Sequence, residues 1–235
     1  MLRLFLPEIC VHCGDSCHTN KRSEALAKYL CSVCLRIFHH EQPPSTDDLR
    51  MLTTVFNDFS NAVDYTAAFI FRKDDIVQSL IHHFKYLDMP KLAEIVGAVS
   101  WHQTSLRDKQ YDYIIPVPLH RTRYSERGFN QSERLAKGIS SVSHFPVAKR
   151  GWLKRVRPTP SQTGLSFIER EENVRGAFEL TKRGLNELNR KSLLIVDDVI
   201  TTGATMASVV RTLESAKPKR LDVFSFAAVI ENSSS

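Results

Sequence analysis

Short apolar runs alternate with longer segments of helical periodicity along this chain. Four runs, at residues 65–71, 111–117, 193–196 and 221–229, have the length and composition of buried strands. Between them, apolar residues recur three and four positions apart, as on one face of a helix, in segments that begin near residues 75, 90, 130 and 204. Strands that alternate with helices predict an α/β fold, with a mainly parallel sheet and helices on both faces.

The run at 193–196 leads into the most informative segment of the chain. Two carboxylates follow four apolar residues, and a loop of hydroxyl-bearing and small residues then opens a helix. Carboxylates accept hydrogen bonds from the hydroxyls of a ribose, and N–H groups at a helix N-terminus favour a phosphate. Ligands bind at the carboxyl ends of parallel strands. We therefore predict a ribose 5-phosphate site made of Asp197, Asp198, Thr201, Thr202, Gly203, Ala204 and Thr205.

Other interpretations of this segment make different demands on the chain. A receiver domain also opens with a strand and an acidic pair, but it needs most of its domain after the pair, and only 37 residues follow Asp198. The Gly-x-x-x-x-Gly-Lys-Ser/Thr phosphate loop is absent from the sequence. A strand–helix turn that carries acids and threonines by chance stays open.

Two further segments belong near the same edge of the sheet. Pro116 and Pro118 end the second strand, and the arginines that follow can grip anionic oxygens with a planar fork. We predict phosphate contacts from Arg121 and Arg127 and contacts to nucleic acid from Arg123; a solvated basic loop is the alternative. Residues 157–178 predict a mobile polar loop whose Gln162, Thr163 and Arg170 contact a ligand, unless Arg170 only decorates a surface helix.

All five cysteines lie before residue 35. Two Cys-x-x-Cys pairs with 17 residues between them have the spacing of a zinc site, and four thiolates would complete a closed, structural tetrahedron. Disulfides are the alternative, but no signal peptide is evident, which favours a reduced, cytoplasmic setting. We predict zinc at Cys10, Cys13, Cys31 and Cys34, in a module of residues 1–40 that a linker (41–60) joins to the α/β domain (61–235).

Composition describes a soluble globular chain with no stretch long enough to span a membrane: 42% of residues are apolar, 25% are charged and the net charge is +6. Between Arg134 and Phe167, however, seven basic residues occur and no acidic one. A basic track with an aromatic ring suits single-stranded nucleic acid. Besides Arg123, we predict this role for Arg150, Trp152, Lys154, Arg155 and Arg157; a buried strand that starts at Trp152 is the alternative.

Residues 193–205 resemble the phosphoribosyl-pyrophosphate (PRPP) motif of type I phosphoribosyltransferases, in which the acidic pair contacts ribose, the loop holds the 5-phosphate and Mg²⁺ binds the pyrophosphate. Three other features accompany this motif: the paired Cys-x-x-Cys motifs, the Pro-Val-Pro and Arg-Gly-Phe-Asn-Gln segments, and the Gln-Thr-Gly-Leu segment. With all of them, the chain is similar to the ComF (ComFC/GntX-like) family. One departure is Pro160-Ser161 ahead of Gln162.

This resemblance implies a type I phosphoribosyltransferase domain and a role in natural transformation, in which single-stranded DNA is handled on the cytoplasmic side. It also implies a competence helicase or other DNA-processing proteins as partners. Two function classes follow: a competence-associated protein that binds single-stranded DNA, and an active phosphoribosyltransferase that uses PRPP and a nitrogen nucleophile. No general base stands out in the motif.

Overall fold

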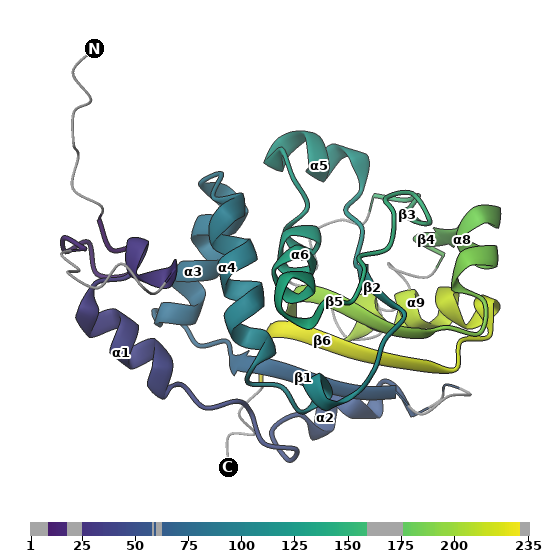
Figure 1. Ribbon diagram of the computed structural model, residues 1–235, viewed down its shortest axis with the longest axis horizontal. Coiled ribbons are helices and arrows are strands. Elements are labelled where there is room, and N and C mark those ends of the chain that lie inside the picture. Colours follow the sequence, from purple (N-terminus) through teal and green to yellow (C-terminus); the bar gives the residue numbers. More distant parts are fainter. Residues whose placement is uncertain (1–8, 18–24, 58, 60–62, 159–175, 231–235) are drawn as a thin grey trace.

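The computed structural model describes residues 9–17, 25–57, 59, 63–158 and 176–230 (Figure 1). Its centre is a four-stranded sheet in the order β1-β6-β5-β2, and every pair in it is parallel. The strands are β1 (Val63–Ile70), β2 (Tyr113–Pro116), β5 (Ser192–Ile200) and β6 (Arg220–Ala228). A separate antiparallel pair consists of β3 (Leu153–Arg155) and β4 (Phe178–Leu180). The predicted α/β class and parallel sheet are confirmed.

Helices cover both faces of the sheet. One face packs against α1 (Ser32–His40), α3 (Ile76–Tyr86), α4 (Pro90–Trp101) and α6 (Gln131–Ser143). The other packs against α2 (Arg50–Thr54), α8 (Lys182–Leu188) and α9 (Ala204–Leu213). α5 (Arg121–Arg127) buries none of its residues. Single 3-10 turns complete the described elements, at Ala25–Lys28, Ser105–Asp108 and Glu214–Ala216.

Helix starts coincide with the signals in the sequence. The Asp75 carboxylate caps α3 by accepting a hydrogen bond from the Gln78 N–H, and Pro90 occupies the first turn of α4. The Asn130 side chain caps α6 by accepting from the Ser132 N–H at 3.1 Å. α6 therefore begins at a fixed point, directly beside the carboxyl ends of β2 and β5.

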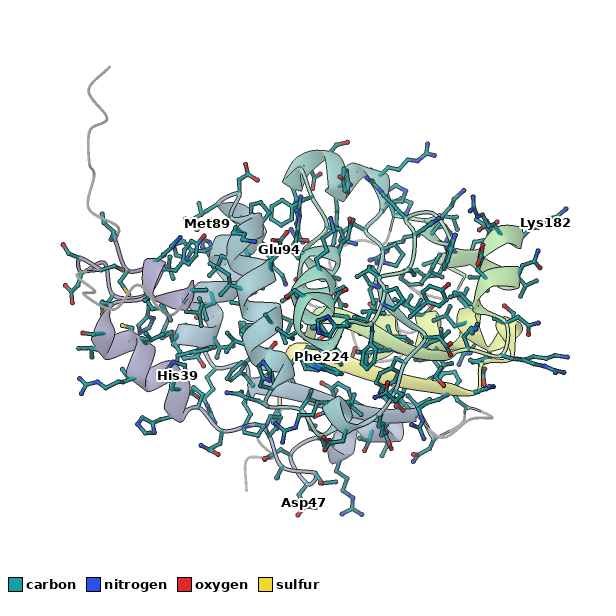
Figure 2. All side chains as sticks on the ribbon, in the orientation of Figure 1. His39, Asp47, Met89, Glu94, Lys182 and Phe224 are labelled. Carbon is teal, nitrogen blue, oxygen red and sulfur yellow. The ribbon has the colours of Figure 1, made fainter. Side chains whose placement is uncertain are left out.

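Successive side chains along each strand point to opposite faces of the sheet, so the apolar core has two parts, one on each face. On β5, Leu194 and Val196 face the α3–α4–α6 layer, whereas Leu193 and Ile195 face the α2–α8–α9 layer. Phe224 on β6 lies inside the first layer (Figure 2), where its ring centroid is 6.1 Å from that of Trp101. Each central strand is thus buried on both sides, as its nearly continuous apolar sequence predicts.

Close contact between α4 and α6 depends on two glycines. A methyl group at Gly138 would overlap the Glu94 carbonyl oxygen, and one at Gly97 would overlap the Leu135 carbonyl oxygen. The two backbones therefore pack directly against each other, which fixes α6 and the residues at its N-terminus.

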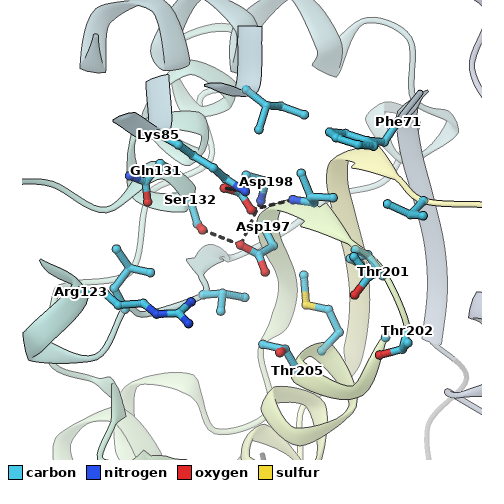
Figure 3. Close-up of a pocket in the computed structure, with 18 of the residues that line it drawn as sticks. Phe71, Lys85, Arg123, Gln131, Ser132, Asp197, Asp198, Thr201, Thr202 and Thr205 are labelled. Carbon is cyan, nitrogen blue, oxygen red and sulfur yellow. Dashed lines mark hydrogen bonds and ion pairs between the residues drawn. The ribbon is translucent and has the colours of Figure 1, made fainter. Parts of the chain in front are cut away.

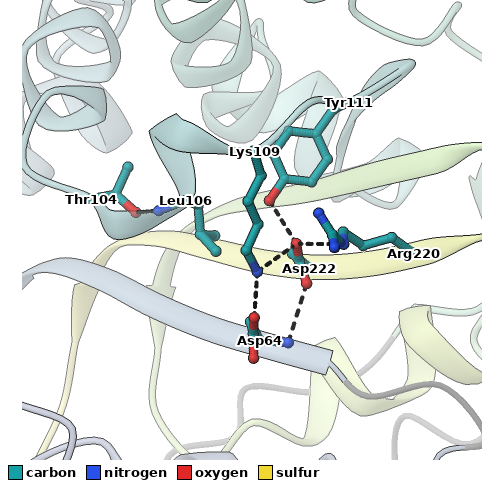
Figure 4. A network of polar contacts seen from close by, with 7 residues as sticks. All are labelled: Asp64, Thr104, Leu106, Lys109, Tyr111, Arg220 and Asp222. Carbon is teal, nitrogen blue, oxygen red and sulfur yellow. Dashed lines mark hydrogen bonds and ion pairs between the residues drawn. The ribbon is translucent and has the colours of Figure 1, made fainter.

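A polar network holds the amino ends of β1 and β6 together (Figure 4). Asp222 is 1% exposed, accepts from the Tyr111 hydroxyl at 2.6 Å and pairs with Lys109 at 3.1 Å. Its other oxygen accepts from the Asp64 N–H at 3.2 Å. Burial, and then the Asp222 carboxylate, raise the pKa of Tyr111, so its hydroxyl stays protonated as a donor. This network stabilises the amino ends of the strands, on the side of the sheet opposite their carboxyl ends.

Packing also connects the N-terminal segments to the sheet. Cys10, Cys31 and Cys34 are buried in the same apolar cluster as α3 and α4. Leu49, Leu52 and Phe56, within the segment predicted as a linker, are 3–6% exposed and belong to the opposite core. This part of the predicted linker is therefore packed structure.

Candidate functional site

The acidic pair lies inside a strand and not after it. β5 continues through Asp197 and Asp198 to Ile200, so the expectation of a strand that ends at Val196 was too short. The strand continues because Asp197 and Val199 stay in register with Ser225 and Ala227 of β6. Both carboxylates line one cavity of about 540 Å³, together with every residue from Thr201 to Thr205 (Figure 3).

The loop after β5 is built for an anion. Gly203 has φ +78° and is the N-cap of α9, so no side chain caps the first N–H groups of that helix. The Thr202 hydroxyl oxygen is buried and has no hydrogen-bond partner in the described part of the chain. A phosphate on this loop would meet helix N–H groups and a hydroxyl donor. Gly203 is buried, and a methyl group added to it would lie 3.3 Å from a Val55 methyl carbon, so a larger residue there would strain the fold.

Two side chains from other helices hold the acidic pair. Ser132 at the start of α6 donates to Asp197 Oδ1 at 2.7 Å. Lys85 near the end of α3 pairs with Asp198 Oδ2 at 2.8 Å, and the two side chains are only 18% and 12% exposed. Burial, and then the neighbouring Asp198 charge, raise the pKa of Asp197 to about 7, while Ser132 and Lys85 act in the opposite direction. Asp197 therefore changes charge near neutral pH.

Neither Lys85 nor Ser132 was predicted as a site residue. Ser132 follows the Arg-Gly-Phe-Asn-Gln segment directly, so that motif was the signal that could have found it. Lys85 lies in an ordinary amphipathic helix more than a hundred positions before Asp198, and its local sequence gives no such signal.

Arginines form the opposite wall of the cavity. Arg123, Arg127 and Arg155 line it, and Figure 3 shows Arg123 pointing inward from the side opposite Thr201 and Thr202. Burial, and then the nearby Arg123 charge, lower the pKa of Arg155. Two guanidinium groups held close together in a partly buried wall favour an anionic ligand between them.

The arginine assignments therefore change in part. Arg127 lines the cavity that contains the predicted phosphate loop, whereas Arg121 is exposed at the start of α5 and is not among the described lining residues. Arg123 and Arg155, which were assigned to nucleic acid, line the cavity instead. Arg121 and Arg123 differ because residues 121–127 form a helix, in which only side chains three or four positions apart, such as Arg123 and Arg127, face the same side.

Gln131 adds an unpaired donor to this wall. It is 1% exposed, and its Oε1 accepts from Arg127 at 3.2 Å. Its buried Nε2 has no partner among the described residues. A buried amide that lines a cavity with a donor to spare is suited to an acceptor oxygen of a ligand.

Trp152 is not available for stacking on a base. Its side chain is 5% exposed and its ring lies edge-on to Tyr113, with centroids 5.2 Å apart. The buried-strand alternative is the one the structure supports, because β3 starts at Leu153 and packs on the core. Trp152 is therefore a core residue, and its assignment to nucleic acid was wrong.

The basic track is also partly neutralised. Arg134 pairs with Glu94 at 2.9 Å and Lys137 pairs with Glu133 at 3.2 Å. Lys149, Arg150, Lys154 and Arg157 are exposed. Arg150 stacks on the Tyr124 ring of α5 at 4.0 Å from its centroid, which places the segment before β3 beside α5 (Figure 1). The predicted loop residues Gln162, Thr163 and Arg170 lie outside the described residues.

The four predicted metal ligands come together. The Sγ atoms of Cys10, Cys13, Cys31 and Cys34 lie within 4.8 Å of one another, and those of Cys13 and Cys31 are 3.6 Å apart. Four sulfurs about 2.3 Å from one tetrahedral zinc would lie at about this mutual distance. The His12 ring, which lies between Cys10 and Cys13 in the sequence, forms a hydrogen bond with the Ser79 hydroxyl of α3 at 2.9 Å. The cysteines are thus positioned to hold a metal ion.

Comparison with known proteins finds similarity to a phosphoribosyltransferase domain and to competence and DNA-utilization proteins. The family model described as "Phosphoribosyl transferase domain" matches residues 134–235. Competence protein F of Haemophilus influenzae is 28% identical over 218 residues, which is 93% of this chain and 83% of that protein. DNA utilization protein YhgH of Shigella flexneri is 37% identical over 102 residues, 43% of each chain. Competence protein ComFC of Bacillus subtilis is 27% identical over 164 residues, 68% of this chain and 62% of that protein.

Within the described ranges, none of the helices combines the length and the apolar character that a bilayer crossing needs.

The phosphoribosyltransferase match covers β5, β6 and the cavity loop between them, and the three relatives carry competence or DNA-utilization names. The chain is therefore similar to competence proteins of the ComF type, and its residues 134–235 match a phosphoribosyltransferase domain.

Proposed function

We propose that the cavity binds a ribose 5-phosphate group, as in PRPP with Mg²⁺. The observation that carries this proposal is that one cavity brings together two carboxylates, the N-terminus of α9 and three arginines. Asp197 and Asp198 would accept hydrogen bonds from the ribose hydroxyls, and the Thr201–Thr205 loop would hold the 5-phosphate. A bound Mg²⁺ would neutralise part of the charge of a pyrophosphate group.

We further propose that the protein acts on single-stranded DNA in a competence-associated, cytoplasmic role. Support comes from the names of the relatives and from the exposed basic side chains of Lys149, Arg150, Lys154 and Arg157 beside α5. Such a patch would follow a phosphate backbone without reading its sequence. We assign zinc to the cysteine cluster, since four thiolates close a structural site and clustered thiols suit a reducing compartment.

A phosphoribosyltransferase reaction is the second candidate. Arg123, Arg127 and Arg155 supply more positive charge than one phosphate needs, which suits the pyrophosphate of PRPP. In that reaction a nitrogen nucleophile would form a bond to the ribose C1, and pyrophosphate would leave. Release of pyrophosphate from PRPP in the presence of an amine would favour this candidate.

Calorimetry with Mg-PRPP, a nucleoside 5′-phosphate and a short single-stranded oligonucleotide tests the phosphate site. Asp198→Asn removes a charged acceptor and should weaken PRPP binding by about 1.5–3 kcal/mol. Asp108→Asn, at a side chain that is 83% exposed, is the matched control and should bind as the wild type does. Absence of any binding at millimolar ligand would contradict the proposal.

A salt titration tests the DNA surface. The apparent affinity for single-stranded DNA should fall by about 0.7 log units per phosphate contact for each log unit of salt. Changing Arg150, Lys154 and Arg157 together to Gln should reduce both the affinity and this slope. A charge-matched control changes the exposed Lys73, Lys182 and Lys219 to Gln. Equal losses in both variants, or equal affinity for heparin, would exclude DNA as the specific ligand of this surface.

A further inference from the structure

The last turns of α3 present an exposed aromatic pair to the cavity. Tyr86 is 62% exposed. Among the described residues, every other Phe, Tyr and Trp is partly or fully buried. The exposed His82 ring lies one helical turn before it, with ring centroids 5.3 Å apart and planes tilted by 46°. Both side chains line the cavity that contains Asp197 and Asp198.

The position of Tyr86 is fixed by its neighbours on α3. Phe84 is fully buried, and Lys85 forms the ion pair with Asp198. These two contacts anchor the end of the helix to the core and to the site. The Arg127 guanidinium also lies 5.4 Å from the centroid of the Tyr86 ring. Tyr86 is therefore held at the cavity wall by its helix and by Arg127, although most of its own surface stays open.

A ligand that uses the whole cavity needs two different ends. One part must be anionic, because the α9 N-terminus lines the cavity and arginines face it from the opposite wall. The other end meets aromatic rings, which favour a flat π-system stacked on them. A cavity of about 540 Å³ is within the usual range for a small-molecule site. A nucleoside 5′-phosphate combines these two properties in one molecule.

We propose that Tyr86, with His82 beside it, is a stacking platform for the base of a nucleotide whose 5′-phosphate lies on the Thr201–Thr205 loop. This inference rests on the proposed ribose 5-phosphate site and names the ligand class of that site. The shared chemistry is a 5′-phosphorylated nucleoside unit, which a free nucleotide and the 5′ end of a single strand both contain. Tyr86 would thereby take the stacking role that the buried Trp152 cannot perform.

Three ligands and two variants test the platform. The ligands are ribose 5-phosphate, 2-aminopurine riboside 5′-phosphate, and a single-stranded oligonucleotide with 5′-phosphorylated 2-aminopurine at its end. Tyr86→Leu should lower the affinity for the free nucleotide roughly 5- to 150-fold, the range for loss of one base–aromatic stack, and should abolish the quenching of 2-aminopurine fluorescence. Its affinity for ribose 5-phosphate should not change. Tyr86→Phe keeps the ring and should behave as the wild type in all three titrations.

The outcomes separate the platform from the phosphate site beneath it. Leu185→Ala removes another exposed apolar side chain, on α8, and should leave all three affinities unchanged. If the wild type binds ribose 5-phosphate but Tyr86→Leu retains affinity and quenching with both the free nucleotide and the oligonucleotide, the platform is wrong and the phosphate site stands. If the wild type binds neither ligand, both proposals fail. Loss with the oligonucleotide but not with the free nucleotide would assign the platform to a strand end, and the reverse would assign it to a free nucleotide.

Discussion

Replacing Lys85 by Met tests whether the ion pair to Asp198 relieves repulsion within the acidic pair. At 2.8 Å the attraction is about 6 kcal/mol for an effective dielectric constant of about 20, before desolvation of both ions is subtracted. Removing one partner of a fully buried pair costs about 3–5 kcal/mol. Because this pair borders a cavity, we expect Lys85→Met to lower the free energy of unfolding by roughly 2–4 kcal/mol at neutral pH.

Lys91→Met is the matched control for this measurement. Lys91 pairs with Glu94 at nearly the same distance, 2.9 Å, but its side chain is 72% exposed and solvent screens the pair, so Lys91→Met should leave the free energy of unfolding nearly unchanged. Urea unfolding followed by circular dichroism gives both values. Equal effects of the two substitutions would refute the claim that burial makes the Lys85 pair important.

The effect of Lys85→Met on the free energy of unfolding should also depend on pH in a definite direction. The pKa of Asp197 is raised to about 7 in the folded state, so the stability it contributes is present at low pH and is lost as the pH rises through 7. Lys85 acts to lower that pKa. In Lys85→Met the pKa of Asp197 should rise further and the loss should extend to higher pH. The difference between variant and wild type should therefore be smallest near pH 5 and largest near pH 8; a difference that is flat across this range would show that the two acids are not coupled to Lys85.

Three further predictions concern the rest of the molecule. Elemental analysis of the purified protein should give one zinc per chain, and Cys34→Ser should lose it; full thermal stability in chelator would count against a structural metal. Trp152→Ala should lower the free energy of unfolding by about 3–5 kcal/mol, as for a core aromatic, with little effect on DNA affinity once the variant is folded. Asp222→Asn should cost about 1–3 kcal/mol in urea unfolding, because Tyr111 and Lys109 lose a charged acceptor, and ligand affinity at the far edge of the sheet should be retained.

Features with a strong local signal were predictable from the sequence. The parallel strands follow from apolar runs, α3 and α6 begin at their capping residues, and the four cysteines meet as their spacing indicates. The cavity loop was also predictable, because Asp197, Asp198 and Thr201–Thr205 are nearly contiguous and the carboxyl end of one strand places them together. In each case the signal is a short pattern of residues that lie close together in the sequence.

The remaining features depend on tertiary packing, which local patterns do not contain. Lys85 meets Asp198 only because α3 packs beside β5, and nothing in its own helix indicates this. Arg121 and Arg123 are two residues apart, yet only Arg123 of the two lines the cavity, because the segment is helical. Trp152 follows a basic stretch, but the register of β3 and its contact with Tyr113 bury it. A charged neighbourhood in the sequence is therefore no guide to which side chains are exposed.

Helix α3 connects the cysteine cluster to the cavity. Cys10, Cys31 and Cys34 belong to the same apolar cluster as Val77, Leu80 and Phe84 of α3, and His12 bonds to Ser79 on that helix. The same helix ends with the Lys85 ion pair and the Tyr86 ring at the cavity wall. An N-terminal segment of this size has too little apolar surface to fold alone, so a bound metal would order it and hold α3 in place. Through this contact the cysteine segment packs against the helix that supplies one wall of the cavity, so loss of the metal should also weaken ligand binding there.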